Sequence, residues 1–323
     1  MLIEIFTILA GVVIILALAE IIVMRSISVA SHFGVSGTFV GLTVLSIGTS
    51  IPEIMTHIVG SIEIVSDPTI LNTMSSLLIG TNIGSDIFQQ NFILGIVGLL
   101  GAVYVVKKNL LSEVGGLILA ALLVWFFSFG GFISRIEGAV LLLAYVAYLI
   151  YIKRTTMRSK ELALNHLTKR KVWSSGLLVL FCFIIMAMVS YQVLNASTVL
   201  VELLPISASF FGLLILGIAT ALPELTTALV AALKHKKDIS AGVLIGSNIT
   251  NPLFGIGLGA MISTYTVPSV VIWYDLPFKL ITAFFIFYFL FRNEKLNKWE
   301  AVVLILLFLV YLVVRLFLFP VDF

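Results

Sequence analysis

The segment Ser46-Ile-Gly-Thr-Ser-Ile-Pro-Glu53 fixes the architecture of this chain, which contains it a second time as Gly217-Ile-Ala-Thr-Ala-Leu-Pro-Glu224. Both copies place Thr-x-x-Pro-Glu inside a long apolar run. Pro52 and Pro223 have no amide hydrogen, so each leaves a carbonyl one turn earlier without its helical donor. A broken backbone and a carboxylate are tolerated at membrane depth only where they line a cavity or a site. Two copies in two halves predict the central binding site of a transporter.

The composition is that of an integral membrane protein. Of the 323 residues, 60% are hydrophobic and 11% are charged, and the mean hydropathy is +1.18. A soluble protein of this size could not bury so much apolar surface. The apolar runs continue over about 20 residues without alternating, which favours membrane-spanning helices over a β-barrel. The single Cys182 excludes a disulfide framework within the chain.

The apolar runs predict ten membrane-spanning helices in two sets of five. Their approximate bounds are 3–24, 36–62, 70–99, 108–129, 132–152, 172–194, 205–232, 239–264, 269–291 and 298–319. A basic cytoplasmic linker, 153–171, separates the first repeat (1–152) from the second (172–323). An odd number of spans per repeat means that the second repeat enters the membrane in the opposite sense. We therefore expect an all-α integral membrane protein of two inverted five-helix repeats, with helices 2 and 7 broken.

Basic residues are distributed unevenly between the expected loops. If the N-terminus lies outside the cell, the inside-facing loops hold all but three of the 19 Lys and Arg residues. The exceptions are Arg135, Lys279 and Arg315. This asymmetry follows the positive-inside rule and predicts a multi-pass protein of the cell membrane with both termini outside. The basic loops then serve as topology signals, so we expect the lipid bilayer as partner, no nucleic acid and no obligatory protein partner.

Oxygen-bearing side chains surround the first Pro-Glu pair. Thr49 and Ser50 lie four and three residues before Glu53, so a continuing helix places all three on one face. Hydroxyls, a freed carbonyl and a carboxylate form an oxygen-only set, which suits a hard cation. His57 follows Glu53 by one turn. This histidine is either a packed or cavity-facing residue or a proton partner of Glu53.

The third and eighth expected spans share a second motif, Gly-Ser-(Asp/Asn)-Ile-x-(Gln/Asn). It sets Ser85 four residues before Gln89, on one helix face. Ser247 and Asn251 have the same spacing in the second copy. The glycines permit close packing against the broken helices. Helix packing alone would explain the glycines, but it would not explain amides that recur in both halves.

At these residues the chain resembles the calcium/cation antiporter superfamily, and most closely its prokaryotic sodium/calcium exchanger branch. The resemblance covers two α-repeats, here 41–95 and 212–257, and the ten-span layout extends it to the whole chain. It implies alternating-access antiport without a cofactor or an enzymatic activity, in which Ca²⁺ leaves against entering Na⁺. The cation sites are then expected between spans two, three, seven and eight. The implied ligands are the carboxylates of Glu53 and Glu224, the hydroxyls of Thr49, Ser50, Ser85, Thr220 and Ser247, the main-chain carbonyls of Ser46 and Gly217, and the amides of Gln89 and Asn251.

The second Pro-Glu motif departs from the family pattern. It reads Ala219-Thr-Ala where Gly-Thr-Ser is usual, so Ala221 lacks the hydroxyl that Ser50 retains. One flanking Na⁺ site is therefore expected to be weak or absent.

The third span also departs from the pattern. Asp86 stands where Asn is usual and adds a third acid within the membrane, with either a structural or a functional role. A structural role would have it bonding to a neighbouring backbone. Gln89 likewise stands where Asn is usual, and an alternative register would use Thr81 and Ser85 in place of Ser85 and Gln89.

Exchange follows from the charge of such a site. Two facing carboxylates within the membrane would not both stay ionised without a cation, because like charge and desolvation oppose it. Ca²⁺, Na⁺ ions or protons would each neutralise them and therefore compete. Na⁺/Ca²⁺ antiport is the preferred function. H⁺/Ca²⁺ antiport is the alternative, favoured by the missing hydroxyl at Ala221 and by His57, and another divalent substrate such as Mg²⁺ or Mn²⁺ stays open.

Two other classes of function fit less well. An ion channel would use the same polar break but would conduct Ca²⁺ without a counter-ion. An intramembrane hydrolase would need a nucleophile–base pair or a metal motif, and the sequence contains neither Gly-x-Ser-x-Gly nor His-Glu-x-x-His. The sequence therefore favours an antiporter.

Overall fold

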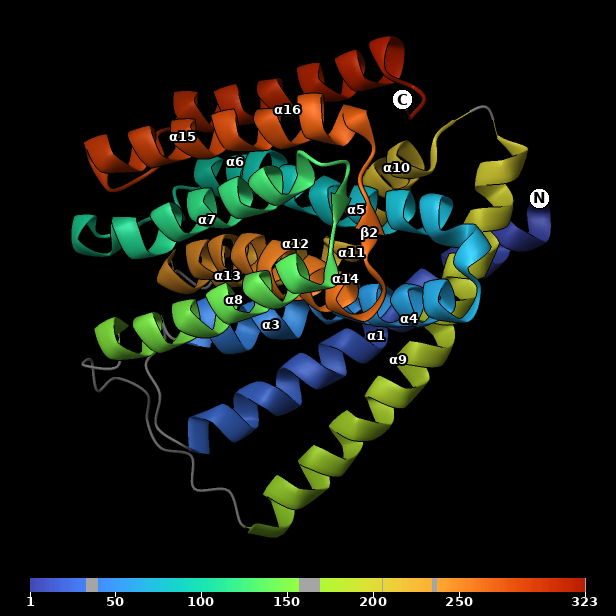
Figure 1. Cartoon of the computed structure of the whole chain (residues 1–323). Helices are drawn as coiled ribbons and strands as arrows, with labels where there is room; N and C mark the ends of the chain where they lie inside the picture. Colours follow the sequence, from blue (N-terminus) through green and yellow to red (C-terminus); the bar gives the residue numbers. More distant parts are fainter. Residues whose placement is uncertain (33–39, 157–168, 205, 234–236, 323) are drawn as a thin grey trace.

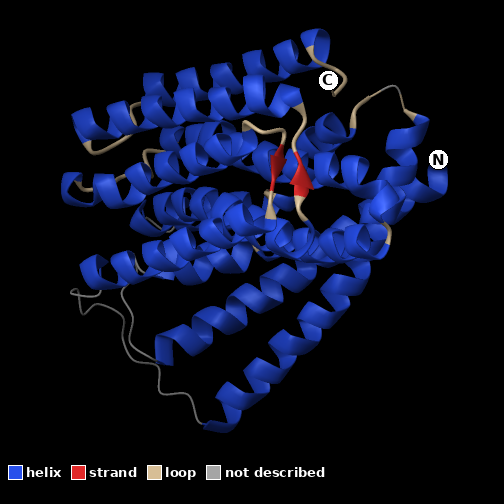
Figure 2. Ribbon diagram, viewed as in Figure 1, coloured by secondary structure: helices blue, strands red, loops and turns tan. Residues whose placement is uncertain are grey.

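Nearly all of the chain that the structure describes is helical (Figure 1; Figure 2). The structure is a computed structural model, and it describes residues 1–32, 40–156, 169–204, 206–233 and 237–322. Helices suit this sequence, because a segment within the hydrocarbon layer must satisfy its own backbone hydrogen bonds. Two short strands, β1 (Phe132–Ile133) and β2 (Tyr265–Thr266), pair antiparallel and join the two halves.

The helices follow the expected runs closely. In chain order they are α1 (Leu2–His32), α3 (Ser46–Thr49), α4 (Ile51–Ser66), α5 (Leu71–Ile87), α6 (Leu94–Leu99), α7 (Lys107–Ser128), α8 (Arg135–Thr156), α9 (Lys169–Leu203), α10 (Ala208–Phe211), α11 (Gly217–Thr220), α12 (Leu222–Leu233), α13 (Lys237–Thr250), α14 (Gly257–Ser263), α15 (Leu276–Asn293) and α16 (Lys298–Leu318). Wider, π-helical turns lie at Val40–Leu45, Phe88–Ile93, Gly212–Leu216, Asn251–Ile256 and Val271–Asp275, and a 3₁₀ turn lies at Pro68–Ile70.

Seven helical stretches among the described residues are long and apolar enough to cross a membrane. They are Lys107–Ser128, Arg135–Arg154, Trp173–Leu203, Ala208–Leu233, Ser240–Ser263, Val271–Asn293 and Lys298–Leu318. Each overlaps one of the last seven expected spans. The first three expected spans overlap α1, α3–α4 and α5–α6; the helix is interrupted at Ser50 in the second of these and by a π-helical turn in the third. A helical protein with several membrane spans is therefore confirmed, whereas the number ten and the inverted arrangement stay predictions.

Each Pro-Glu helix is interrupted where its proline predicts. Ser50 alone separates α3 from α4, and Ala221 alone separates α11 from α12. The proline is the second residue of the new helix and has no N–H to continue the earlier hydrogen-bond ladder. A π-helical turn precedes both breaks, and another follows the Gly-Ser motif in both halves. The sequence repeat is thus matched by repeated backbone irregularities of a kind that is frequent at functional sites.

Glycines bring the two halves into close contact. A Cβ atom on Gly84 of α5 would lie 2.4 Å from the Cα atom of Leu213. Conversely, a Cβ atom on Gly212 would lie 2.3 Å from the carbonyl oxygen of Leu77. Gly246 of α13 meets the first half in the same way, with a backbone oxygen 2.8 Å from the position of a Cβ atom. The expected role of the glycines in close helix packing is therefore confirmed.

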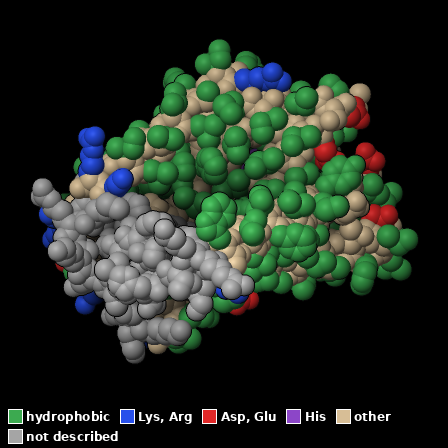
Figure 3. Space-filling model, turned by 90° about the horizontal axis from the view of Figure 1, so that it is seen from below, with side chains coloured by type: hydrophobic (Ala, Val, Ile, Leu, Met, Phe, Trp, Pro, Cys, Tyr) green, Lys and Arg blue, Asp and Glu red, His purple; other side chains and the backbone are tan. Residues whose placement is uncertain are grey.

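The outer surface is strongly apolar. Large hydrophobic side chains that are at least 67% exposed line the long helices; they include Leu111, Phe126, Ile136, Leu143 and Phe317. Figure 3 shows such side chains over most of one face, with charged groups mainly near its edges. An apolar surface of this extent suits contact with lipid rather than with water.

Replacing Gly84 by alanine should destabilise the fold. The added methyl group would overlap the backbone at Leu213, and overpacking of this kind costs about 1–3 kcal/mol. The melting temperature of the detergent-purified protein should therefore fall. Gly176→Ala in α9 is the matched control, because nothing lies within 4 Å of its Cβ position. Equal melting temperatures for Gly84→Ala and the parent would contradict the contact.

Candidate cation-binding site

Glu53 and Glu224 are fully buried acids at the two helix breaks. Each is the third residue of the helix that follows the break, and each is 0% exposed. The dipole at the start of a helix stabilises a negative charge there. In both carboxylates the Oε2 atom has no hydrogen-bond partner. A buried acceptor of this kind is costly to leave unpaired, and a bound cation would satisfy it.

Hydroxyl groups cross between the two broken helices to reach these acids. Ser50 Oγ donates to Oε1 of Glu224 at 3.4 Å, and the Thr49 hydroxyl faces the same carboxylate. In return, the Thr220 hydroxyl faces Glu53. Each broken helix therefore supplies hydroxyls to the acid of the other, so the two motifs form one site.

Gln89 links the third expected span to the eighth. Its Nε2 atom donates to Ser85 Oγ at 2.9 Å, and the Ser85 hydroxyl donates to Oε1 of Glu53 at 2.8 Å. The Oε1 atom of Gln89 accepts from Ser247 Oγ at 2.5 Å and from Asn248 Nδ2 at 3.3 Å. A chain of hydrogen bonds thus runs from the second half, through Gln89 and Ser85, to the acid of the first half.

The ligand types suit reversible binding of a hard cation. Among the described residues, no group of three or more His, Cys, Asp or Glu side chains is arranged to hold a metal ion. The site instead combines two carboxylates with hydroxyl and amide oxygens. Hard cations such as Ca²⁺ and Na⁺ take oxygen ligands, and their affinity rises with the number of charged ligands. Two carboxylates surrounded by neutral oxygen ligands are therefore suited to reversible binding of a cation.

The sequence model of a known family covers both halves of the chain. It is that of the sodium/calcium exchanger protein family, and it matches residues 3–153 and 173–317. This chain belongs to that family. Its members are exchangers rather than enzymes, and the helical, apolar structure agrees with a multi-pass membrane protein of this kind.

Individual relatives of this exchanger-family chain extend over most of its length. The inner membrane protein YrbG of Escherichia coli (strain K12) is 30% identical over 262 residues, which are 78% of each chain. The sodium/calcium exchanger MaX1 of Methanosarcina acetivorans is 25% identical and covers 95% of this chain and 96% of its own. The solved structure of the sodium-calcium exchanger NCX_Mj superposes with a TM-score of 0.67 at 24% identity, covering 96% of this chain and 97% of that one. The latter likeness shows a shared fold.

Asn251 of the exchanger lies in a second polar group, apart from the hydrogen-bond chain through Gln89. Its Nδ2 atom donates to Oδ1 of Asp86 at 2.9 Å, while its own Oδ1 atom has no partner. Asp86 also forms an ion pair with Lys279 of α15, and both side chains are 0% exposed. Asp86 therefore bonds to side chains of the other half and not to a neighbouring backbone.

The ion pair of Asp86 with Lys279 was not predicted from the sequence of the exchanger. Part of a signal was present, since both lie inside apolar runs, but Lys279 shares its run with Asp275, four residues earlier. Charged side chains at membrane depth are rare and commonly pair with one another. The two residues are 193 positions apart, so only the fold identifies them as partners.

The two predicted main-chain ligands already accept hydrogen bonds. The carbonyl of Ser46 accepts from the amide of Ser50 at 3.0 Å and from the Thr49 hydroxyl at 3.4 Å. The carbonyl of Gly217 accepts in the same way from the amide four residues later, at 3.2 Å, and from Thr220 at 3.3 Å. A cation at either carbonyl of the exchanger would displace the threonine hydroxyl from it.

The alternative register with Thr81 has less support in the geometry. The Thr81 hydroxyl donates to the carbonyl of Leu77 at 2.7 Å, within its own helix. Gln89, by contrast, contacts Ser85 and the second half directly. The arrangement therefore favours Ser85 with Gln89 as the pair that faces the acids of the exchanger.

His57 belongs to a separate buried network. Its Nε2 atom accepts from Asn82 Nδ2 at 3.0 Å, which leaves Nδ1 to donate to the Tyr265 hydroxyl at 2.9 Å. That hydroxyl lies 2.7 Å from Ser61 Oγ, which donates to a backbone carbonyl. Both ring nitrogens are thus occupied by partners other than Glu53. The packed interpretation of His57 fits the exchanger better than that of a proton partner.

Introducing a hydroxyl at Ala221 should strengthen Na⁺ binding. Ala221 is fully buried at the break that corresponds to Ser50, whose hydroxyl contacts the opposite acid. Ala221→Ser would offer Glu53 the matching hydroxyl, and one such polar contact contributes about 1 kcal/mol, or about fivefold in affinity. We expect tighter Na⁺ binding with little change in Ca²⁺ affinity, measured by isothermal titration. Ala231→Ser, ten residues further along in α12, is the control and should change neither affinity.

Proposed function

We propose that this protein exchanges Ca²⁺ against Na⁺ by alternating access at the site between Glu53 and Glu224. The observation that carries the proposal is a pair of fully buried carboxylates, one from each half, each with an unpartnered oxygen and a surrounding shell of hydroxyls. The names of MaX1 and NCX_Mj as sodium/calcium exchangers support the same pair of ions.

Charge balance explains why such a site would exchange cations. Two buried acids repel each other and lose most of their contact with solvent, so the site is unstable without compensating positive charge. One Ca²⁺ ion or several Na⁺ ions supply that charge through oxygen ligands. Because the two kinds of ion compete for the same carboxylates, binding of one releases the other. A site that is stable only when filled then couples the two fluxes.

Contacts between the halves support ten helices in two inverted repeats. α1 packs against α9 and α7 against α15, which are counterparts in the two repeats. α5 packs against the segment before the second break, while α13 packs against the segment before the first. A two-fold axis in the membrane plane would produce this exchange of neighbours. We place the repeats at 1–152 and 172–323; most of the linker, 157–168, lies outside the described residues.

The distribution of charge supports the topology with both termini outside the cell. Figure 1 shows the two ends of the chain on the same side of the molecule. In Figure 3, most visible acidic side chains lie toward that side and several basic ones toward the other. The positive-inside rule then assigns the basic side to the cytoplasm.

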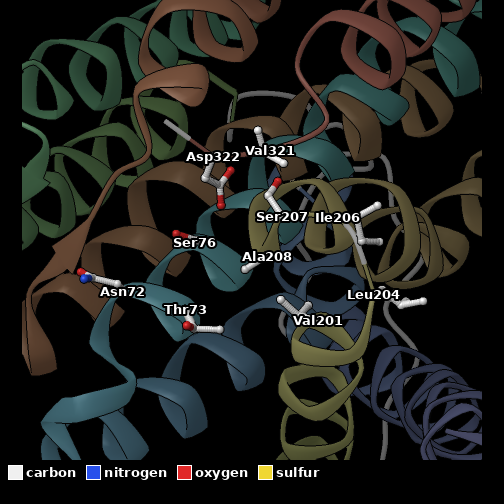
Figure 4. Close-up of a pocket in the computed structure, with 10 residues that line it drawn as sticks. All are labelled: Asn72, Thr73, Ser76, Val201, Leu204, Ile206, Ser207, Ala208, Val321 and Asp322. Carbon is white, nitrogen blue, oxygen red and sulfur yellow. The ribbon is translucent and has the colours of Figure 1, made fainter.

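A cavity at the N-terminal end of α5 is suited to be the entrance for ions from outside the cell (Figure 4). It measures about 580 Å³, and its polar lining includes Asn72, Thr73, Ser76, Ser207 and Asp322. From this cavity α5 continues two to three turns to the serine that contacts the first acid. In between, Gly80 of α5 packs closely against the backbone of Ser209 in α10. Alternating access at the first acid would require this contact to open.

Labelling a cysteine in this cavity should block transport. Thr73→Cys places a thiol in the entrance, whereas the single native Cys182 is only 2% exposed and should not react. A membrane-impermeant thiol reagent added outside should reduce Ca²⁺ uptake by Thr73→Cys and leave the parent unaffected. Complete modification without loss of uptake would argue against this path.

H⁺/Ca²⁺ antiport is the second candidate, and the absent hydroxyl at Ala221 favours it. Without that hydroxyl the second break offers fewer neutral oxygens to Na⁺ than the first. The position of His57, whose ring nitrogens bond to Asn82 and Tyr265, gives this candidate no additional support.

Neutralising either central acid should abolish Ca²⁺ transport. Glu53→Gln and Glu224→Gln each keep the size of the side chain but remove half of the negative charge that faces the divalent ion. We expect no gradient-driven ⁴⁵Ca²⁺ uptake by either variant in proteoliposomes, with monodisperse protein after purification. Glu202→Gln, at an exposed acid of α9, is the control and should transport normally. Near-normal uptake by a folded Glu53→Gln or Glu224→Gln protein would refute the assignment.

A further inference from the structure

We propose that Lys279 acts as a tethered cation, whose ammonium group permanently takes the place of one mobile monovalent cation beside Asp86 and Asn251. The inference rests on the proposed exchange function, because it concerns one corner of the same site. It makes Lys279 a residue that determines how many monovalent ions the protein binds.

The two repeats build matching corners, which differ in charge. Asp86 and Asn248 occupy equivalent positions in the Gly-Ser motif. Asn248 Nδ2 contacts the amide oxygen of Gln89 at 3.3 Å, and the amide of Asn251 contacts Asp86 at 2.9 Å. We call each of these contacts a corner of the site: the first consists of Asn248 and Gln89, and the second of Asp86 and Asn251. In each, the residue after the serine of the Gly-Ser motif contacts an amide side chain of the other half. The first corner is neutral, whereas the second contains an acid.

Lys279 compensates the acid of the second corner. Its Nζ atom forms an ion pair with Oδ2 of Asp86, while Oδ1 of that carboxylate accepts from Asn251. The backbone of Lys279 is fixed as well, because its carbonyl accepts a hydrogen bond from Gln90 Nε2 at 2.7 Å. Gln90 and Asp86 belong to the same continuous helical stretch. Lys279 is therefore anchored to that stretch twice, by its backbone carbonyl and by its ammonium group.

The ammonium group does here what a bound alkali ion would do. Asp86 and Lys279 are both 0% exposed, and a buried carboxylate without a positive partner would be strongly destabilised. A mobile cation at the same carboxylate would meet the ammonium at close range, and repulsion between like charges is strong in a low-dielectric interior. Asn251 also turns its NH₂ group, not its oxygen, toward this carboxylate. The corner is therefore neutral and closed to a second cation.

Removing the lysine side chain should allow a mobile cation to bind beside Asp86. In Lys279→Met the carboxylate of Asp86 loses its partner, so an alkali ion that fits the corner will bind there and stabilise the folded state. In the double variant Asp86→Asn with Lys279→Met, the corner is neutral again and needs no ion. The parent and the double variant thus provide matched controls for the single one.

The test is a thermal melt of each purified protein in NaCl, KCl, LiCl or choline chloride at constant ionic strength, without Ca²⁺. We expect the melting temperature of Lys279→Met to be several degrees higher in at least one alkali chloride than in choline chloride. In the parent and in the double variant, the same difference in melting temperature should be smaller. Equal differences in all three proteins would overturn the proposal. So would a Lys279→Met protein that cannot be purified folded in any of the four chlorides, since an ion should rescue a vacant corner.

A transport assay gives the second measure. Lys279→Met should require one more monovalent cation per cycle, seen as a steeper dependence of ⁴⁵Ca²⁺ flux on that cation, whereas the double variant should keep the dependence of the parent. A purely structural ion pair would leave the steepness unchanged. The thermal melt does not depend on which ion is coupled, so it stays decisive even if Na⁺/Ca²⁺ exchange itself is refuted.

Discussion

Two carboxylates buried away from solvent impose the constraint on which the rest of this structure depends. Glu53 and Glu224 are 0% exposed, and each keeps one oxygen that has no hydrogen-bond partner. Such groups persist in a protein interior only where cations or donors are provided. The proline breaks, the crossing hydroxyls and the glycine contacts all bring oxygen ligands from both halves to these acids. The fold is thereby organised to hold positive charge at its centre.

The two halves share a backbone plan but not a ligand set. Both contain a π-helical turn before the Pro-Glu break and another after the Gly-Ser motif. Their side chains differ at several places. Among them, Ala221 lacks the hydroxyl of Ser50, and Asp86 carries a charge that Asn248 does not. A repeated scaffold can thus keep the geometry of a site while single substitutions change which ions each part of it binds.

The features that local rules govern could be predicted from the sequence. A proline removes a helical hydrogen bond wherever it stands, so the breaks at Ser50 and Ala221 follow directly. Glycines that recur in a helix of an apolar chain indicate close packing, as found at Gly84. Gln89 also contacts Ser85, as their four-residue spacing suggested. Ser50 and Thr49, expected on the face of Glu53, instead face Glu224 of the other half.

Contacts between distant segments could not be predicted in this way. The pairing of Asp86 with Lys279 requires the position of α15 relative to α5, which no local spacing defines. The same holds for His57, whose partner Tyr265 is brought to it by β2.

The measurement that tests the central claim most directly is ⁴⁵Ca²⁺ uptake into proteoliposomes that contain the purified protein. The vesicles are loaded with Na⁺ and diluted into Na⁺-free buffer; a second set receives only a pH gradient, in the absence of Na⁺. Competition between Na⁺ and Ca²⁺ for the two acids predicts rapid uptake driven by the Na⁺ gradient and little uptake driven by the pH gradient alone. Robust uptake with the pH gradient and none with the Na⁺ gradient would contradict the account and make the protein a proton-coupled antiporter.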